Sequence, residues 1–359
     1  MHPINFRFRI VTLVFAGVLA MSASAAPQGA RLVRENGYDG CIELSNVVTR
    51  VVLDPNLGGR VLRYQLEGAE VLFQDPSEDG VIYQPGGRSV LPSAGRFDIG
   101  PETTLPRHPT LYVGRWTGEI TGDRAARLTS QRDPALDLVL TREFKLAAQG
   151  SHLVCTQTIR NVGRESRRVF HWSRTLAAPG GICFVPLNSR SRYPQGYAVY
   201  APGSRSGRVG AAIDFRPESE PNIRVREGLL EFLGPPANPK YAIDPDAGWM
   251  AYLTRNHLLF VKKFPVYPDR VYGEIAANSA CIYYHPKFCE LEPIGPVEEL
   301  APGQSASFTE EWWLHEFAFP EDRQSNLAAV RARVAASVAR ATDSPEPAST
   351  KSREAKKAP

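Results

Sequence analysis

The feature that most limits the fold is a long series of short segments in which apolar and polar residues alternate. The series runs from about residue 41 to residue 314, and turn residues separate its segments. Alternation with a period of two places every second side chain on one face of an extended strand, so it is typical of half-buried β-strands. The clearest segments are residues 47–53, 116–120, 126–130, 151–160, 167–176, 181–186, 249–253, 258–264, 279–284, 288–292 and 305–314. We therefore predict an all-β fold of antiparallel sheets.

The C-terminal part of the chain follows other patterns. Residues 321–342 are rich in Ala and Arg, and their apolar residues recur at helical spacing, which predicts one terminal helix. These apolar residues are Leu327, Val330, Val334 and Val338. Residues 343–359 are rich in Pro, Ser, Lys and Glu without apolar periodicity, so we predict a disordered tail. No repeat of fixed period is present, and the expected β domain occupies residues 30–320.

The N-terminus has the three parts of a secretory signal peptide. Arg7 and Arg9 precede an apolar run of about 12 residues, Ile10 to Met21, and the small residues Ala23-Ser24-Ala25 follow it. We expect removal of residues 1–25 and a mature protein that is periplasmic or secreted. A helix that crosses a bilayer needs about 20 apolar residues, so we expect no membrane span. A retained N-terminal anchor is the alternative.

Charge and motif content exclude several classes of function. The precursor has a formal net charge of +4, which becomes +2 without Arg7 and Arg9, and acidic and basic residues are interspersed. A nucleic-acid partner is therefore not expected. The chain has no phosphate-binding loop, no dinucleotide-binding glycine fingerprint, no nucleophile elbow and no His-Glu-x-x-His zinc helix. We expect no cofactor, and the oligomeric state is left open.

Five cysteines remain after removal of the signal peptide. They are Cys41, Cys155, Cys183, Cys281 and Cys289. An oxidising compartment permits disulfides and would leave at least one thiol unpaired. Cys281 and Cys289 lie symmetrically about His285-Pro286 and would face each other across a hairpin, so they are the best local candidates for a disulfide. A metal site made of these cysteines and His285 would need helical spacing, which Pro286 opposes, so we expect no metal.

Two regions lack strand-like alternation and are expected to be loops. Residues 84–109 are dense in Gly, Pro and Ser, and residues 188–243 mix Pro, Gly and charged residues. Loops of this length are uncommon inside a compact domain, and those that occur are often functional. We therefore expect these regions to contribute to a site.

Histidines are the first candidates for acid–base chemistry. His108 precedes a proline, where a histidine is usually a turn residue, and a histidine within a strand is usually a half-buried structural group. His171 is more informative because Trp172, Ser173 and Arg174 follow it. An aromatic face, a hydroxyl and a fixed cation together are typical of sugar sites, where a ring stacks on sugar C–H groups and charged groups bind hydroxyls.

Glu290 and Glu292 form a second set of candidates. They stand at positions i and i+2 of a predicted strand, hence on one face of it. Neighbouring carboxylates raise each other's cost of ionisation, so one of them could keep a raised pKa suited to acid or base chemistry. The alternative is that both are solvated. With His171 on the other side of a substrate, Glu292 would form an acid–base pair.

Segments near both ends of the body resemble galactose mutarotase (aldose 1-epimerase)-like proteins. Near the start, these are residues 51–55 (VVLDP) and 58–62 (GGRVL), and near the end they are residues 289–293 (CELEP) and 300–305 (LAPGQS). The intervening segments are most similar to uncharacterised secreted members, the domain of unknown function 4380 type. The resemblance covers roughly residues 35–318.

The resemblance implies a galactose mutarotase-like β-supersandwich with a sugar cleft on the concave face of a large antiparallel sheet. It also implies that Arg96 is the substrate-binding arginine, that His108 and His171 are the family's two histidines, and that Glu292 is the general base. In the family mechanism, the carboxylate takes the proton of the anomeric hydroxyl while a histidine protonates the ring oxygen, which opens the ring. The chain departs from the family at Pro109, where glycine is expected.

Three functions remain open from these features. The first is an aldose epimerase-like enzyme with Glu292 as the base, His171 as the acid and His108 as the second family histidine. The second is a carbohydrate-binding protein that uses the same cleft without proton transfer. The third is a structural envelope protein whose aromatic residues form the core. In the first two, the ligand is a saccharide, and the residues assigned to its binding are Arg96, Trp172, Arg174 and Glu290.

Overall fold

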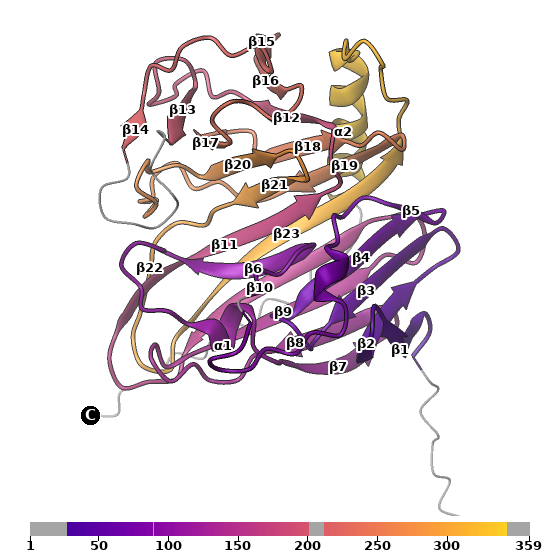
Figure 1. Ribbon diagram of the computed structural model, residues 1–359, viewed down its shortest axis with the longest axis vertical. Coiled ribbons are helices and arrows are strands. Elements are labelled where there is room, and N and C mark those ends of the chain that lie inside the picture. The colour runs from indigo at the N-terminus through magenta and orange to yellow at the C-terminus, as the bar shows by residue number, and fades with distance from the viewer. Residues whose placement is uncertain (1–26, 89, 201–211, 343–359) are drawn as a thin grey trace, which may run out of the picture.

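The structure, a computed structural model, describes residues 27–88, 90–200 and 212–342. Two large antiparallel sheets pack face to face, and one C-terminal helix covers the outside of the second sheet (Figure 1). The predicted all-β sandwich with a C-terminal helix is therefore confirmed. Among the described residues, no helix is both long enough and apolar enough to cross a membrane.

The first sheet has thirteen strands. Eleven of them follow the order β1-β2-β3-β4-β6-β11-β21-β20-β17-β13-β14, while β5 pairs with β4 and β22 pairs with β11. The bounds are β1 (Ala30–Glu35), β2 (Tyr38–Ser45), β3 (Thr49–Asp54), β4 (Arg60–Leu66), β5 (Ala69–Glu70), β6 (Gly95–Gly100), β11 (Arg167–Ala177), β13 (Tyr197–Tyr200), β14 (Ile213–Asp214), β17 (Lys240–Ile243), β20 (Ala280–His285), β21 (Phe288–Pro293) and β22 (Glu298–Leu300).

The second sheet has ten strands in the order β15-β16-β12-β18-β19-β23-β10-β9-β8-β7. The bounds are β7 (Thr117–Gly122), β8 (Ala125–Thr129), β9 (Leu138–Leu146), β10 (Leu153–Asn161), β12 (Ile182–Pro186), β15 (Ile223–Arg226), β16 (Leu229–Phe232), β18 (Trp249–Leu253), β19 (Leu258–Lys263) and β23 (Ser305–Glu316). The short helix η1 (Pro76–Glu78) connects β5 with β6 in the first sheet, and α1 (Pro109–Tyr112) lies in the connection from β6 to β7 of the second sheet.

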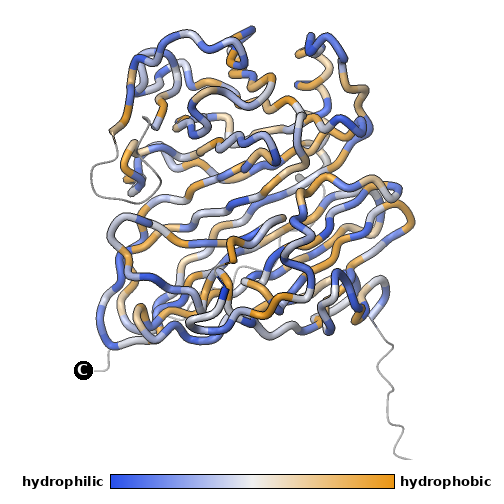
Figure 2. Tube along the Cα trace, viewed as in Figure 1, coloured by the Kyte–Doolittle hydropathy of each residue, from blue (hydrophilic) through white to orange (hydrophobic). Residues whose placement is uncertain are grey.

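Alternating side chains of the two sheets fill the space between them. Phe97 and Leu291 of the first sheet belong to the same buried apolar cluster as Phe260 and Trp312 of the second. Residues between these positions point away from the core, so hydrophobic and hydrophilic residues alternate along the strands (Figure 2). This alternation is the pattern that the sequence showed, and it fixes which face of a strand each side chain occupies.

The C-terminal helix, α2 (Leu327–Thr342), packs an apolar stripe on the outside of the second sheet. Leu327, Val330 and Val334 are buried there against Trp249 and other residues of that face. The helix begins six residues later than predicted, because the side chain of Asn326 accepts a hydrogen bond from the backbone N–H of residue 329 and caps the first turn. The predicted disordered tail lies outside the described residues.

Both regions predicted to be loops contain strands. Residues 84–109 include β6, and residues 188–243 include β13, β14, β15, β16 and β17. The prediction missed β6 because its sequence, Gly-Arg-Phe-Asp-Ile-Gly, places charged residues at alternate positions and every residue in it is buried. Charge in a buried strand is rare, since it needs partners that only the folded chain provides.

The predicted disulfide between Cys281 and Cys289 is wrong. Cys281 pairs with Glu292 across β20 and β21, whereas Cys289 pairs with Tyr284. The two sulfur-bearing side chains therefore point to opposite faces of the first sheet, and all five cysteines are buried free thiols. The hairpin turns between His285 and Phe288, so the position symmetric with Cys289 is Tyr284 and not Cys281.

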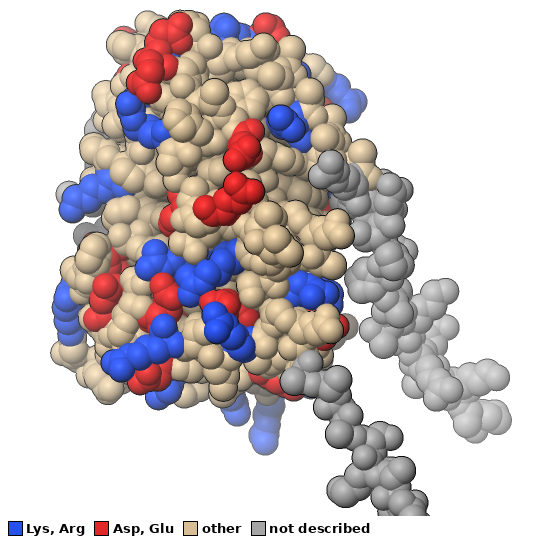
Figure 3. Space-filling model, turned by 90° about the vertical axis from the view of Figure 1, so that its right-hand side faces the viewer, with Lys and Arg blue, Asp and Glu red and all other residues tan. Residues whose placement is uncertain are grey.

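Charged side chains also line the exposed side of the strands at the N-terminal edge of the first sheet. Arg50 pairs with Glu35 at 2.6 Å and with Glu43 at 2.7 Å, and Arg63 pairs with Glu35 at 2.8 Å. Figure 3 shows acidic and basic side chains intermixed on the lower half of the side that includes these strands. Such mixed pairs on an edge discourage strand addition by another chain.

Candidate functional site

The outer face of the first sheet, which is turned away from the second sheet, carries a row of charged side chains at its centre. Arg96 on β6 lies directly opposite Arg174 on β11, and the register of β11 with β21 places Arg174 beside Glu292. Glu292 in turn lies opposite Cys281 on β20. Four neighbouring strands thus hold the row, so backbone pairing fixes the order of its side chains.

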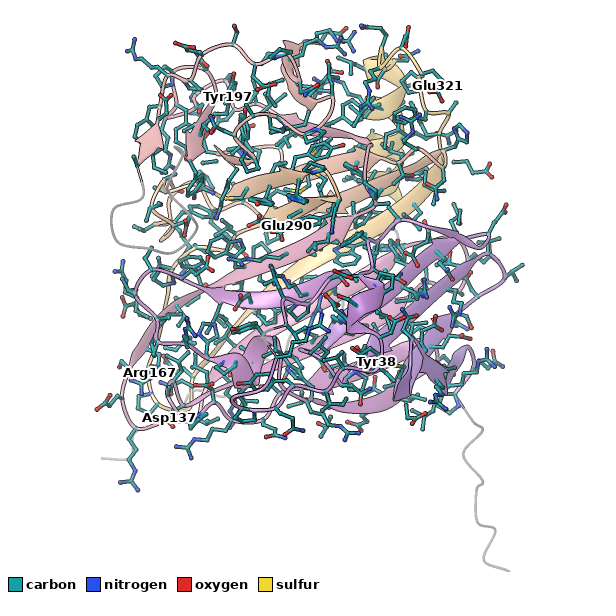
Figure 4. All side chains as sticks on the ribbon, viewed as in Figure 1. Tyr38, Asp137, Arg167, Tyr197, Glu290 and Glu321 are labelled. Atoms are coloured by element: carbon teal, nitrogen blue, oxygen red, sulfur yellow. The ribbon has the colours of Figure 1, made fainter. Side chains whose placement is uncertain are left out.

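Further polar side chains surround this row on the same face. We call the whole set the outer-face cluster. It consists of Arg96, Asp98, Glu102, His108, Trp172, Arg174, Lys240, Glu274, Glu290 and Glu292. All of these residues except Glu102 are buried. Glu290, labelled in Figure 4, lies on β21 near the middle of the molecule. The structure therefore brings together six of the seven site residues that the sequence predicted.

Trp172 holds Glu292 in place. The indole Nε1–H donates to Oε2 of Glu292 at 2.7 Å. The guanidinium carbon of Arg174 lies 4.2 Å from the centroid of the Trp172 ring, and the ammonium of Lys240 lies 4.9 Å from it. Trp172 is 0% exposed, so its ring is covered by protein. The observed contacts of this ring orient the glutamate, and stacking of the ring on a sugar stays a prediction.

Glu290 and Glu292 behave as a coupled pair of carboxyls. Burial raises the pKa of Glu290 to about 7, and the charge of Glu292 adds to the effect. Burial acts to raise the pKa of Glu292 as well. The charges of Lys240 and Arg174 and hydrogen bonds from Glu290 and Trp172 outweigh it, so the pKa of Glu292 lies below its ordinary value. The two carboxyls interact directly, so when the pair holds one proton, that proton resides mainly on Glu290.

A second pair lies at the β6 side of the cluster. His108 contacts Oδ1 of Asp98 through Nε2 at 3.1 Å and the backbone carbonyl of Pro106 through Nδ1 at 2.8 Å. Burial opposes protonation of this imidazole, but the hydrogen bond to Asp98 outweighs it, and the pKa of His108 is raised. Because both ring nitrogens face acceptors, the imidazolium form satisfies both. Arg174 donates to Glu102 at 2.9 Å beside this pair.

Comparison with known proteins identifies the fold. No protein-family model matches the chain, and no curated protein matches it in sequence. A galactose mutarotase-like protein from Lactobacillus casei superposes with a TM-score of 0.53 at 12% identity, over 77% of this chain and 100% of that one. A galactose mutarotase-like protein from Clostridium acetobutylicum gives a TM-score of 0.52 at 10% identity, over 81% of this chain and 99% of that one. The fold is galactose mutarotase-like.

In this mutarotase-like sandwich, His171 lies on the opposite face from Glu292. The His171 ring stacks between Phe97 and Phe308, with centroids 5.8 and 5.7 Å away, and Nε2 contacts the backbone carbonyl of Ala306 at 3.2 Å. Burial lowers the pKa of His171 to about 4. The predicted pairing of His171 with Glu292 across a substrate is therefore wrong, because an odd-numbered residue of β11 points between the sheets.

Several donors of the outer-face cluster have no partner. Arg96 uses Nη2 for a long contact of 3.4 Å to Glu290, while its Nε and Nη1 are buried and bonded to none of the described residues. The Nε of Arg174 is likewise buried and bonded to none of the described residues. A buried polar group without a partner costs about 1–3 kcal/mol. A ligand that offers hydrogen-bond acceptors would remove this cost.

Four members of the cluster were not predicted, namely Asp98, Glu102, Lys240 and Glu274, and neither was Tyr200 beside them. The Tyr200 hydroxyl donates to Glu274 at 2.9 Å, and the Lys240 ammonium lies 4.6 Å from the Tyr200 ring centroid. Burial raises the pKa of Glu274. No local pattern marks these residues, since β13 and β17 join the sheet through long connections. Within the described ranges, no group of three or more His, Cys, Asp or Glu side chains is arranged to hold a metal ion.

Proposed function

We propose that the outer-face cluster binds a saccharide and catalyses proton transfer on it, as an aldose epimerase-like enzyme. The observation that carries this proposal is the coupled pair Glu290 and Glu292, whose pKa values are shifted in opposite directions within one buried row. Two neighbouring carboxyls in different protonation states supply an acid and a base at neutral pH. The likeness of fold to galactose mutarotase-like proteins supports the choice of a sugar as substrate.

In this proposal, Glu292 is the base and Glu290 is the acid. Glu292 takes the proton of the anomeric hydroxyl while Glu290 donates its proton to the ring oxygen as the bond between that oxygen and the anomeric carbon breaks. The open-chain aldehyde then recloses on either face, and the two protons return. Glu290 takes the role that the sequence analysis gave to His171. Trp172 and Arg174 hold the base, and His108 is proposed to orient Asp98 toward the substrate.

Anomer exchange followed by NMR or polarimetry tests the proposal. Glu292→Gln should abolish acceleration of exchange and leave saccharide binding intact, since the amide keeps the size of the side chain but cannot accept the proton. Glu311→Gln, on β23 of the second sheet, is the matched control and should leave exchange unchanged. An active E292Q protein would contradict the assignment of the base.

A non-catalytic carbohydrate-binding protein is the second candidate. The placement of His171 between the sheets favours it, because the histidine predicted to act as the acid is unavailable to a ligand on the outer face. This alternative predicts saccharide binding by the wild-type protein without faster anomer exchange. The two candidates therefore predict different rates of anomer exchange, and both predict saccharide binding.

We also propose that the protein is exported to the periplasm or secreted, on the basis of the predicted signal peptide at residues 1–25. These residues lie outside the described ranges, and the similarity to the domain of unknown function 4380 type likewise stays a prediction. Mass spectrometry of the mature protein from an extracytoplasmic fraction should show an N-terminus at residue 26 or 27. A chain that begins at Met1 in that fraction would support the retained anchor instead.

A further inference from the structure

Lys240 is a mostly buried lysine whose ammonium makes no direct ion pair with a described residue, and the charges of Glu292 and Glu274 act on it from farther away. It is the first residue of β17 and is 7% exposed. Its ammonium lies 4.9 Å from the centroid of Trp172 and 4.6 Å from that of Tyr200. Among the described residues, no acceptor lies within hydrogen-bonding distance of the ammonium, and no carboxylate lies within 4.0 Å of it. Two aromatic rings thus position three N–H donors that the protein itself does not use.

Arg174 brings a second cation to the same indole ring. Its guanidinium carbon is 4.2 Å from the Trp172 centroid, so the two cationic centres are separated by no more than the sum of their distances to that centroid. Arg174 also keeps a buried Nε without a partner. The charge of Arg174 acts to lower the pKa of Lys240, so the two cations repel each other, and an anion near both would offset the repulsion.

The charges of the nearby carboxyls do not prevent these cations from binding such an anion. Glu102 is engaged by Arg174, and Asp98 is engaged by His108. Burial raises the pKa of Glu274, and it raises that of Glu290 to about 7, so both carboxyls are less ionised than ordinary glutamates. Glu292 is the ionised carboxylate near Lys240, and it is already bonded to the Trp172 indole.

We propose that Lys240 and Arg174 bind the carboxylate of an acidic sugar, so that the substrate class is hexuronic acids rather than neutral hexoses. This inference rests on the proposed function of the outer-face cluster and names its substrate. A guanidinium matches a planar carboxylate in geometry, and the ammonium adds a compact charge from another direction. A neutral hexose would leave the charge of Lys240 unused.

Calorimetric titration of the full chain at low salt tests the proposal with defined sugars. The acidic probes are D-glucuronate and D-galacturonate, the neutral ones are D-glucose and D-galactose, and D-glucose 6-phosphate tests a different anion. We expect each hexuronate to bind at least tenfold more tightly than the corresponding hexose and more tightly than the phosphate.

Substitutions at Lys240 then assign the preference to this side chain. Lys240→Met should weaken hexuronate binding about tenfold and leave hexose binding within twofold. Lys240→Arg keeps the charge and should retain the preference, which distinguishes loss of charge from loss of folding. Lys263→Met, at a lysine of β19 that pairs with Glu311 at 3.2 Å, is the matched control and should change neither affinity.

The outcomes separate this inference from the proposed function. Equal affinities for hexuronates and hexoses, or tighter binding of the phosphate, would overturn the assignment to a carboxylate while leaving saccharide binding in place. A hexuronate preference that survives in K240M would overturn the role of Lys240. Absence of binding by all five sugars would overturn the inference and the proposed function together.

Discussion

The protein contains two buried groups built from the same three residue types. One is Trp172, Glu292 and Lys240 on the outer face of the first sheet, and the other is Trp312, Glu310 and Lys262 between the sheets. In each group the indole N–H donates to the glutamate, at 2.7 Å outside and 2.9 Å inside, and the lysine ammonium lies 4.9 Å from the ring centroid. Strand β11 supplies residues to both environments.

The groups differ in how their lysines are bonded. Lys262 donates to the hydroxyl of Thr175 at 2.8 Å, to that of Ser173 at 3.3 Å and to the backbone carbonyl of Leu291 at 3.3 Å, and it pairs with Glu310 at 3.0 Å. The lysine of the outer group has no such partner. A buried charge with every donor used stabilises one arrangement of the core, whereas unused donors are available to a ligand. We therefore interpret the interior group as structural and the outer group as a binding site.

Removal of the interior lysine should have the largest effect. Lys262→Met leaves Glu310 buried without its ion-pair partner, and we expect the free energy of unfolding to fall by about 3–5 kcal/mol. Urea unfolding at neutral pH measures it. Lys263→Met, the partly exposed neighbour, should cost less than about 1 kcal/mol. Equal losses in the two proteins would contradict the structural role of the interior group.

Substitution of His171, which lies between the sheets and not in the outer-face cluster, should have the second-largest effect. His171→Ala removes a ring stacked between two phenylalanines, and we expect a loss of about 2–3 kcal/mol in the free energy of unfolding. Saccharide affinity and anomer exchange per folded molecule should stay unchanged, since the ring lies between the sheets. A variant that keeps its stability but loses activity would instead show that His171 acts in the site.

Arg96, which has two donors without a partner, should show the reverse behaviour. Arg96→Met removes donors that the described residues do not use, and Glu290 can respond to the loss of its long contact by keeping its proton. We expect saccharide binding to weaken at least tenfold while the free energy of unfolding changes by less than about 1 kcal/mol. Arg127→Met, at a partly exposed arginine of β8, is the control. A large loss of stability in R96M would show that the outer residues have a structural role, as the interior group does.

The fold could be predicted from the sequence because period-two alternation and turn residues are local signals. The positions of Glu290 and Glu292 on one face follow from the same alternation, whereas Arg96 lies on a strand that was predicted to be a loop. Strict use of that period would also have separated His171 from Trp172, which are adjacent and therefore point to opposite faces. Lys240 could not be found in this way, since only the pairing of distant strands brings it to the cluster.

The pH dependence of stability tests the coupled carboxyls of the outer group. The pKa of Glu290 is raised in the folded state from 4.5 to about 7, so the folded protein binds more protons than the unfolded chain in this interval. The contribution of Glu290 to stability therefore falls as pH rises from about 4.5 to about 7. Glu290→Gln cannot titrate and should show a shallower decline in urea unfolding across this range. Identical slopes in the two proteins would show that Glu290 does not hold the raised pKa.

The two tryptophan indoles allow the comparison to be tested most directly. A proton–nitrogen NMR spectrum of the full chain reports the indole N–H of Trp172 and of Trp312 separately, with the signals assigned through Trp172→Phe and Trp312→Phe. Addition of D-glucuronate to saturation should shift the Trp172 signal, because its acceptor Glu292 lies in the proposed site, and leave the Trp312 signal in place. An unmoved Trp172 signal in a protein that binds the sugar would contradict the assignment of the outer-face cluster as the binding site.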